Sequence, residues 1–326
     1  MRALVTGSNG FIGSTLVEYL LSKGSEVLCL VRKTSDLRWL QPLAVKTIYG
    51  DLRSPESLAQ VLKKTDLVFH LAGVTKARDA QAYFAGNVQT TKNLLDACEK
   101  FSPAEQKFVF VSSQAAGGPS PDDRPITEAD PANPISLYGR SKLQAEDLVL
   151  KYSQHRHAAI IRPPSVYGPR DRDILTYFAS ANRGILPLLG DGRQKISMIH
   201  VEDLVRGIFL ASQVKEANGR VYYLSGDEEW NWHAIGDLVA RTLNKKPIRL
   251  FIPFWLLDAV SAVNRLAAAI KKRPALLNSD KVREMKQPNW LCSNARAKAE
   301  LTFRPQIELE SGFRQTVDWY RRTGWL

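Results

Sequence analysis

Residues 3–24, ALVTGSNGFIGSTLVEYLLSKG, join a short apolar run to a glycine-rich turn and then to a helix-like stretch. In such a strand–turn–helix unit, glycines permit the tight turn and let backbone N–H groups approach a pyrophosphate at the N-terminus of the helix. A glycine pattern alone is common, but this one stands in the required context. We therefore expect a dinucleotide phosphate site formed by Gly7, Asn9, Gly10, Phe11, Ile12 and Gly13.

The rest of the first half repeats this alternation of strand-like and helix-like segments. Short apolar or β-branched runs, typical of strands covered on both faces, occur at residues 3–6, 27–31, 45–49, 67–71, 108–112 and 159–162. This rhythm predicts an α/β fold with a Rossmann-type doubly wound parallel sheet. We expect residues 1–165 to form the dinucleotide-binding domain, with later strands returning near 196–225, and residues 166–326 to form mainly a smaller C-terminal substrate lobe.

The residues after the second predicted strand bear on the choice of cofactor. At this position a carboxylate normally accepts hydrogen bonds from a free ribose 2′-hydroxyl. Here Arg32 and Lys33 occupy it, and two cations suit a 2′-phosphate. The sequence thus favours NADP over NAD. Asp36 follows a few residues later, and if the loop curls back its carboxylate would accept from the free ribose 2′-hydroxyl of NAD instead.

The turns after the third and fourth predicted strands are further candidate cofactor contacts. In open α/β sheets, ligands bind outside the carboxyl ends of the strands. We expect contacts there with the adenine and with the nicotinamide half of the cofactor. The residues concerned are Asp51 and Leu52 in the first turn and Leu71, Ala72 and Gly73 in the second.

Two polar side chains on one predicted helix indicate the chemistry. Tyr138 and Lys142 are four residues apart, so one helix face carries both. A nearby ammonium stabilises a phenolate and lowers the pKa of the tyrosine, which would make Tyr138 a usable proton donor or acceptor. Ser113 ends the strand-like run FVFVSS. Its hydroxyl would donate a hydrogen bond to a substrate oxygen and hold it against Tyr138.

The chain resembles the extended short-chain dehydrogenases/reductases, the NAD-dependent epimerase/dehydratase family, over nearly its whole length. This family includes nucleotide-sugar epimerases and dehydratases, 3β-hydroxysteroid dehydrogenases and dihydroflavonol reductases. The landmarks that carry the resemblance are TGSNGFIG at Thr6, GDL at Gly50, HLAG at His70, YGRSK at Tyr138 and RPPSVYGP at Arg162.

The resemblance implies a role for each matching residue. It makes Ser113 the orienting hydroxyl, Tyr138 the acid/base, and Lys142 the residue that binds the nicotinamide ribose and tunes the tyrosine. The other implied contacts around the cofactor are Ser112, which is also the second choice for the orienting hydroxyl, Asn87, Pro164 and Val166. The chain departs from the usual epimerase pattern at Arg32, where an acid is expected. This departure counts against NAD and the self-recycling epimerase mechanism.

Charge and cysteine content limit the partners. Lys and Arg (45) exceed Asp and Glu (33), and residues 241–326 hold 17 of the basic and 7 of the acidic residues. No nucleic-acid-binding signature accompanies this charge, so we expect a small-molecule substrate and no nucleic acid. Three cysteines without C-x-x-C spacing and five scattered histidines predict neither disulfides nor a metal site. With no secretory leader, we expect a cytoplasmic protein, and the resemblance permits a homodimer.

Residues 254–270 form a mostly apolar segment whose polar residues lie along one side of a helix. It is too short and too interrupted to span a bilayer. We favour a helix that packs on the sheet domain. The alternatives are a lid over an apolar substrate and a membrane-surface contact reinforced by Lys271, Lys272 and Arg273.

Three functions are compatible with these residues. The favoured one is an oxidoreductase that moves a hydride between the nicotinamide and a carbonyl or alcohol carbon of a small, sterol-like or flavonoid-like substrate. The second is a nucleotide-sugar epimerase or dehydratase with retained NAD, in which Arg170, Arg172 and Arg193 would hold a diphosphate. The third is a non-catalytic dinucleotide-binding sensor, which would not need Ser113, Tyr138 and Lys142 together.

Overall fold

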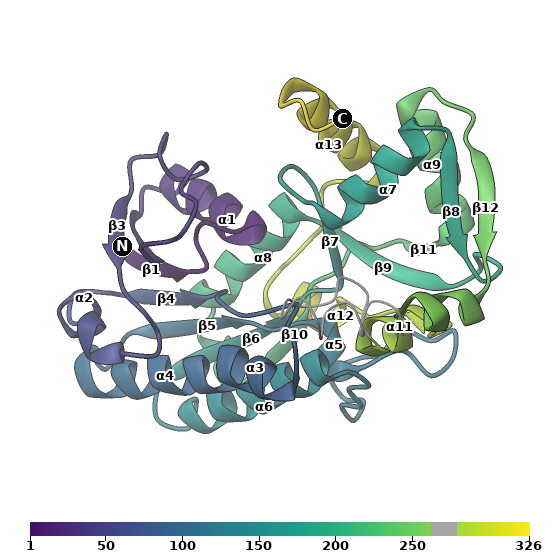
Figure 1. Cartoon of the computed structure of the whole chain (residues 1–326). Helices are drawn as coiled ribbons and strands as arrows, with labels where there is room; N and C mark the ends of the chain where they lie inside the picture. The colour runs from purple at the N-terminus through teal and green to yellow at the C-terminus, as the bar shows by residue number, and fades with distance from the viewer. Residues whose placement is uncertain (262–278) are drawn as a thin grey trace.

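Seven parallel strands form the central sheet of the computed structural model, which describes residues 1–261 and 279–326 (Figure 1). The order across the sheet is β10-β6-β5-β4-β1-β2-β3. The strands are β1 (Arg2–Thr6), β2 (Glu26–Val31), β3 (Lys46–Tyr49), β4 (Leu67–His70), β5 (Lys107–Val111), β6 (His157–Arg162) and β10 (Val221–Tyr223). The order reverses beside β1, which is where dinucleotides bind in such sheets. The predicted Rossmann-type doubly wound sheet is confirmed.

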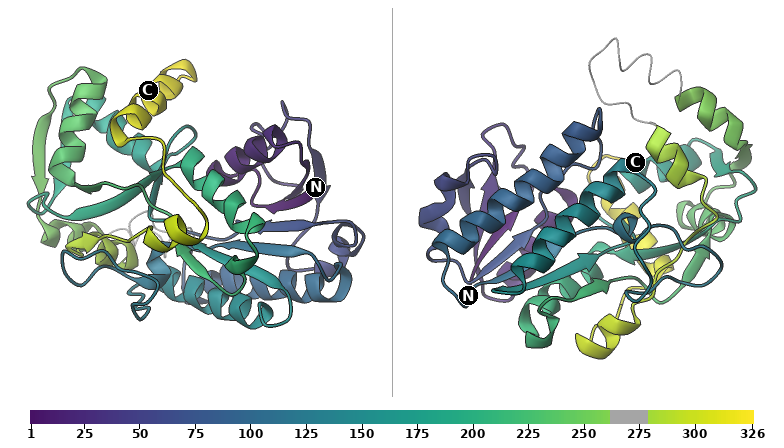
Figure 2. Two further views of the ribbon diagram at one scale, coloured as in Figure 1. Left: turned by 180° about the vertical axis from the view of Figure 1, so that it is seen from behind. Right: turned by 90° about the horizontal axis from the view of Figure 1, so that it is seen from below.

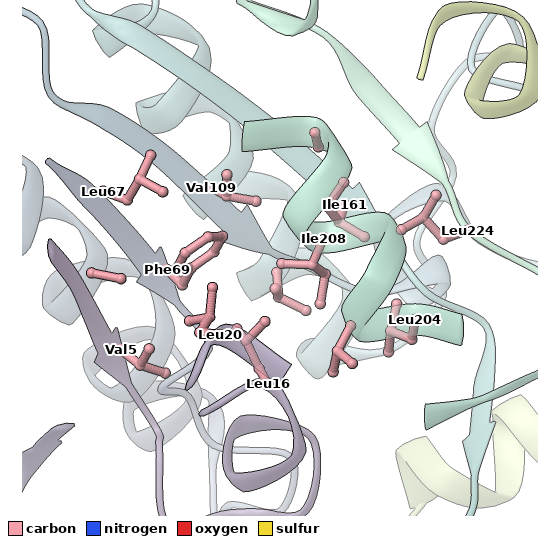
Figure 3. Close-up of a cluster of buried hydrophobic side chains, with 14 of the residues drawn as sticks. Val5, Leu16, Leu20, Leu67, Phe69, Val109, Ile161, Leu204, Ile208 and Leu224 are labelled. Atoms are coloured by element: carbon pink, nitrogen blue, oxygen red, sulfur yellow. The ribbon is translucent and has the colours of Figure 1, made fainter. Parts of the chain in front are cut away.

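Helices α1 (Phe11–Ser22) and α8 (Val201–Gln213) cover one face of this sheet. Successive residues of a strand point to opposite faces, so every second residue of each buried strand reaches this side. Figure 3 shows Phe69 and Val109 of the sheet beside Leu20 of α1 and Ile208 of α8. This apolar cluster fixes the start of α1, and with it the glycine-rich turn, against the sheet.

The other face carries α4 (Thr90–Phe101) and α6 (Leu137–Tyr152), which lie side by side across it (Figure 2). Their apolar residues pack on the alternate strand residues, such as Val68 and Phe108. This packing places the helix with Tyr138 and Lys142 directly on the sheet. The shorter helical segments of the domain are Pro55–Leu58, α2 (Ala59–Leu62), α3 (Ala80–Phe84), the π-helix Ala85–Gln89, α5 (Gln114–Gly117) and Lys215–Ala217.

The smaller lobe is built on two small sheets. Strands β7 (Ser165–Tyr167), β9 (Lys195–His200), β11 (Glu229–Asn231) and β13 (Asn289–Trp290) form one, and β8 (Ile185–Leu189) pairs with β12 (Ile248–Ile252) in a separate ribbon. Its helices are α7 (Asp173–Asn182), α9 (Trp232–Leu243), α11 (Ser279–Met285), α12 (Ala295–Glu300) and α13 (Leu309–Arg322). Within the expected returning segment 196–225, β10 adds a strand to the large sheet and α8 packs on its face. By contrast, β9 pairs with β7, β11 and β13 in the smaller lobe.

The segment expected to form an amphipathic helix at 254–270 is helical over 254–261, and the remainder lies outside the described residues. In the helical part, Leu257 and Ser261 are buried, whereas Trp255, Leu256 and Val260 are exposed. Segment 254–261 therefore packs on the rest of the protein only through a narrow stripe that contains Leu257 and Ser261. Among the helices that the structure describes, none is long and apolar enough to cross a membrane.

Candidate active site

The glycine-rich turn after β1 leaves no room for side chains. Gly7 has a φ of +68°, and a Cβ there would lie 2.8 Å from the Ala72 nitrogen. A Cβ on Gly13 would lie 2.1 Å from the Gly7 carbonyl oxygen. Gly10 is the N-cap of α1 and supplies no side-chain hydrogen bond to the first N–H groups of the helix. The turn thus presents bare backbone and a positive helix end, which fit a pyrophosphate.

The loop after β2 returns to this turn. The Asn9 amide donates to the Asp36 carbonyl oxygen at 3.3 Å, but the Asp36 carboxylate is held by Arg38, which lowers its pKa. The Asp51 carboxylate, after β3, is likewise held by Arg53 at 2.6 Å, and its pKa is lowered too. Arg32 and Lys33 are exposed, and no ion pair is found for either within 1–261 and 279–326.

A buried chain of hydrogen bonds beneath the turn was not anticipated from the sequence. The Thr6 hydroxyl accepts from the Ala72 N–H at 3.1 Å and donates to His70 Nδ1 at 2.7 Å, because the neutral ring carries its proton on Nε2. His70 Nε2–H then donates to the Thr91 hydroxyl at 3.0 Å, which donates to the Asn87 carbonyl oxygen at 2.6 Å. Burial lowers the pKa of His70 to about 3, so the ring is neutral and the direction of this chain is fixed. This series of hydrogen bonds links β1 to the segment after β4.

Asn87 lies in the π-helix that precedes α4, and irregular turns of this kind often occur at functional sites. Its side chain accepts from the Val74 N–H at 2.7 Å and donates to the Ser141 hydroxyl at 2.9 Å. A Cβ on Gly73 would lie 2.8 Å from the Asn87 Oδ1 atom. Asn87 therefore fixes the segment Leu71, Ala72 and Gly73 against the helix that carries Tyr138 and Lys142.

Tyr138 lies in the first turn of α6, which begins where the Ser136 hydroxyl caps the Gly139 N–H at 3.0 Å. Its phenol lies near the Ser113 hydroxyl, which acts to lower the pKa of Tyr138. The Ser113 oxygen also caps α5 by accepting from the Ala115 N–H at 3.2 Å. The structure thus brings the predicted serine and tyrosine close together at the carboxyl end of β5.

The predicted lowering of the Tyr138 pKa is not found. Burial raises the pKa of Tyr138 to about 12, and the nearby Ser113 hydroxyl offsets this only in part. The reason is the position of the neighbouring ammonium: Lys142 Nζ donates to the Val111 carbonyl oxygen at 2.8 Å and lies over the Phe110 ring. Lys142 is 4% exposed, and burial lowers its pKa to about 7.

A buried ion pair anchors the same stripe of α6. Glu146 lies four residues beyond Lys142, and its carboxylate receives a two-pronged hydrogen bond from Arg162 of β6, at 2.6 Å in the closest contact. Arg162 also donates to the Tyr223 hydroxyl of β10 at 3.0 Å. Residues 138, 142 and 146 share one helix face, so this pair sets the rotation of α6 about its axis.

The other predicted contacts lie along the same sheet edge. Ser112, at the end of β5, has a buried hydroxyl without a hydrogen-bond partner in the described part of the chain. Pro164 and Val166 are half-buried where the chain leaves β6. Leu52 is buried after β3. Apart from Asn87, Tyr138 and Lys142, which lie on helices, the predicted cofactor residues lie in segments that follow the carboxyl ends of sheet strands.

The lobe contributes an acid that no sequence pattern indicated. Asp280 accepts from the Leu137 N–H at 3.0 Å, which docks α11 on the start of α6. Glu284, one turn further along α11, lies close enough to Tyr138 to contribute to its raised pKa. The Glu284 Oε1 atom is buried and has no hydrogen-bond partner among the residues that the structure describes, although Lys281 pairs with Oε2 at 3.3 Å. Glu284 thus keeps one buried carboxylate oxygen without a hydrogen-bond partner near Tyr138.

The fold and this edge of the sheet define an NAD(P)-dependent enzyme of the extended short-chain dehydrogenase/reductase type. More narrowly, the chain belongs to the NAD-dependent epimerase/dehydratase family, whose model matches residues 3–225. The members of this family that resemble the chain include both reductases and epimerases.

Three similar proteins illustrate this range. A ceramide reductase from Caulobacter vibrioides is 29% identical over 334 residues, which cover 99% of this chain and 95% of that protein. A 4-hydroxy-2-methyl-3-oxo-4-farnesyl-3,4-dihydroquinoline-1-oxide ketoreductase from Stigmatella aurantiaca is 29% identical over 87% of this chain and 90% of its own. The crystal structure of a dTDP-glucose 4,6-dehydratase from Streptomyces venezuelae with NAD and TYD bound is 25% identical, with a TM-score of 0.81 and coverage of 100% and 98%.

Proposed function

We propose that this protein uses NADPH to reduce a carbonyl group of an apolar, lipid-like substrate, with Tyr138 as the proton donor. The observation that carries the proposal is the proximity of the Tyr138 and Ser113 hydroxyls at the carboxyl edge of the sheet. The Ser113 oxygen accepts from the Ala115 N–H, and its own hydrogen would turn from Tyr138 to a substrate oxygen that binds beside both hydroxyls. Two hydroxyl donors thus meet where a carbonyl oxygen would bind.

The residues divide the chemistry in a simple way. When bound, the nicotinamide supplies the hydride that forms the new C–H bond. Ser113 donates to the carbonyl oxygen and orients it. Tyr138 then transfers its proton to that oxygen and later regains one from water, which completes the alcohol. A pKa of about 12 keeps Tyr138 protonated at neutral pH, as a proton donor requires. Lys142 would hold the nicotinamide ribose.

The preference for NADPH rests on the surroundings of β2 and β3. Asp36 and Asp51 are carboxylates near this edge, and each is already paired with an arginine, which a ribose 2′-hydroxyl would have to share. Arg32 and Lys33 are exposed and suited to a 2′-phosphate. The backbone of Gly7, Gly10 and Gly13 would hold the pyrophosphate.

The proposed substrate class rests on the similar reductases and on α11. The names of the two similar reductases refer to a ceramide and to a farnesyl-bearing ketone, both with long apolar parts. The buried Oε1 atom of Glu284, near Tyr138 and without a hydrogen-bond partner, would suit a hydroxyl or amide N–H near the reacting carbonyl. We therefore expect a substrate that combines an apolar chain with one such donor.

A nucleotide-sugar epimerase or dehydratase is the alternative, and its diphosphate would need free cations. The three arginines considered for this role already have partners: Arg170 pairs with Glu18 at 2.6 Å, Arg172 lies over the Trp325 ring, and Arg193 pairs with Asp191 at 3.7 Å. This alternative predicts that UDP- or GDP-sugars raise the melting temperature of the protein. It also predicts that the purified protein retains NAD.

Replacement of Tyr138 tests the proposal. We expect Tyr138→Phe to fold normally but to lose NADPH-dependent reduction of long-chain ketones by about 10²- to 10⁴-fold, because the proton donor is removed. Tyr152→Phe is the matched control: Tyr152 ends the same helix, and its buried hydroxyl has no hydrogen-bond partner within the described ranges. Turnover measured by NADPH absorbance, with circular dichroism of both variants, decides the matter. Full activity of Tyr138→Phe would refute the assigned role.

A further inference from the structure

The β8–β12 ribbon has two faces of different character. Its strands pair in parallel, so residues side by side in the register share a face, and successive residues alternate. One face looks toward α9: Leu186 and Leu188 are buried there, Arg249 pairs with Asp237 of α9, and Phe251 contacts His233. The opposite face, called the outer face below, consists of Ile185, Pro187, Leu189, Ile248, Leu250 and Ile252. It contains no polar side chain.

Half of the outer face is strongly exposed, and Pro187, Leu189 and Ile252 are half-buried. Ile248 is 77% exposed, Leu250 52% and Ile185 47%. The helical segment directly after β12 adds Trp255, which is 68% exposed. In a soluble protein, a contiguous apolar patch of this kind commonly marks a contact with another molecule. The ribbon lies at the side of the lobe away from the large sheet (Figure 1), so contact there leaves the active site clear of the partner.

Three cations border one end of the outer face. Arg183 precedes β8, and Lys245 and Lys246 precede β12; because the strands are parallel, all three lie at the end that carries Ile185 and Ile248. All three are exposed, and no ion pair is found for them in the parts of the chain that the structure describes. An apolar face beside free cations complements a surface that is apolar inside and anionic outside.

We propose that the outer face and its three cations dock this protein on an anionic phospholipid bilayer. Apolar side chains would enter the acyl boundary while the cations meet lipid phosphates. A second copy of the chain fits less well, because three acids near the ribbon are already paired with basic side chains of the same chain. These pairs are Asp237–Arg249, Asp191–Arg193 and Asp258–Lys286. Docking would bring the proposed reductase to the phase that holds apolar substrates, and in that respect it rests on the proposed function.

Sedimentation with lipid vesicles tests the docking without any measurement of turnover. We expect the full chain to sediment with phosphatidylcholine vesicles that contain about a third phosphatidylglycerol, and to bind them more weakly at high salt. Vesicles of phosphatidylcholine alone should bind it much less. Lys245→Gln/Lys246→Gln should weaken binding about 25-fold, about fivefold for each charge. Ile248→Ser/Leu250→Ser should weaken it at least about tenfold, through loss of apolar contact.

A matched control and three outcomes keep the test decisive. Lys63→Gln/Lys64→Gln removes the same charge from two exposed lysines of the sheet domain and should leave binding unchanged. The proposal fails if the full chain stays in the supernatant with the anionic vesicles, or if this control weakens binding as much as the ribbon variants do. It also fails if light scattering finds a dimer that Ile248→Ser/Leu250→Ser dissociates, since the face would then be covered by a second copy. Any of these results leaves the Tyr138 experiment unaffected.

Discussion

Two ion pairs show how differently the sheet domain and the lobe are built. Glu146 and Arg162 join α6 to β6 with side chains only 1% and 7% exposed. Asp237 and Arg249 join α9 to β12 with side chains 48% and 46% exposed. The same contrast holds for apolar groups: of the nine large hydrophobic residues exposed in the described chain, seven lie in the lobe, between residues 185 and 260.

The contrast reflects what each region holds in place. The sheet domain must keep Ser113, Tyr138 and Lys142 at fixed positions, and buried pairs and hydrogen-bond chains such as that of His70 remove alternative arrangements. The lobe surface around the ribbon holds no such group. Its apolar residues are left facing outward, where they are available for contact. Rigidity thus lies where the chemistry is proposed, and exposed apolar surface lies where docking is proposed.

Removal of one charge from each pair should break this comparison most clearly. We expect Glu146→Gln to lower the free energy of unfolding by about 3–5 kcal/mol, because it leaves the Arg162 guanidinium buried without its counter-ion. Asp237→Asn removes the same charge from the exposed pair and should cost less than about 1 kcal/mol. Urea unfolding of both variants measures the difference. Equal losses would mean that burial does not distinguish the two pairs.

The cationic end of β2 offers the next largest effect. Arg32→Ser/Lys33→Ser should weaken NADPH binding about 10- to 100-fold, because the 2′-phosphate loses its charged donors, while NADH binding should change little. Lys63→Gln/Lys64→Gln removes the same charge elsewhere in the sheet domain and controls for long-range electrostatics. Fluorescence titration of the emptied protein with each cofactor measures both constants. Tightly retained NAD, or equal affinity for the two cofactors, would contradict the proposed preference.

The parts of the molecule that the sequence predicted are those encoded by local spacing. The glycine turn, the strand rhythm and the helix that carries Tyr138 and Lys142 each depend on residues close together in the chain, and the structure has them as expected. The pKa of Tyr138 was predicted in the wrong direction, because four-residue spacing places Lys142 on the same face but does not say that Val111 holds its ammonium.

The His70 chain and Glu284 were missed for a related reason. The His70 chain joins residues 6, 70, 87 and 91, which only the strand order brings together. Glu284 comes near enough to Tyr138, 146 positions away in the sequence, to raise its pKa, through the docking of α11 by Asp280. Contacts of this kind leave no periodic trace in a sequence. The roles assigned to the individual cofactor residues stay predictions, as do the cytoplasmic location and the homodimer.

Replacement of Glu284 should have the smallest effect on activity of the changes considered. It tests directly whether the lobe takes part in substrate recognition. We expect Glu284→Gln to lower kcat/KM about tenfold for a long-chain ketone with a hydroxyl on the neighbouring carbon, mainly by raising KM, because a charged acceptor for that hydroxyl is lost. The same ketone without the hydroxyl should react equally well with both forms. Glu229→Gln, at an exposed position of β11, controls for the change in charge. If both ketones lose activity alike, Glu284 serves only to dock α11, and the lobe takes no part in recognition of the donor.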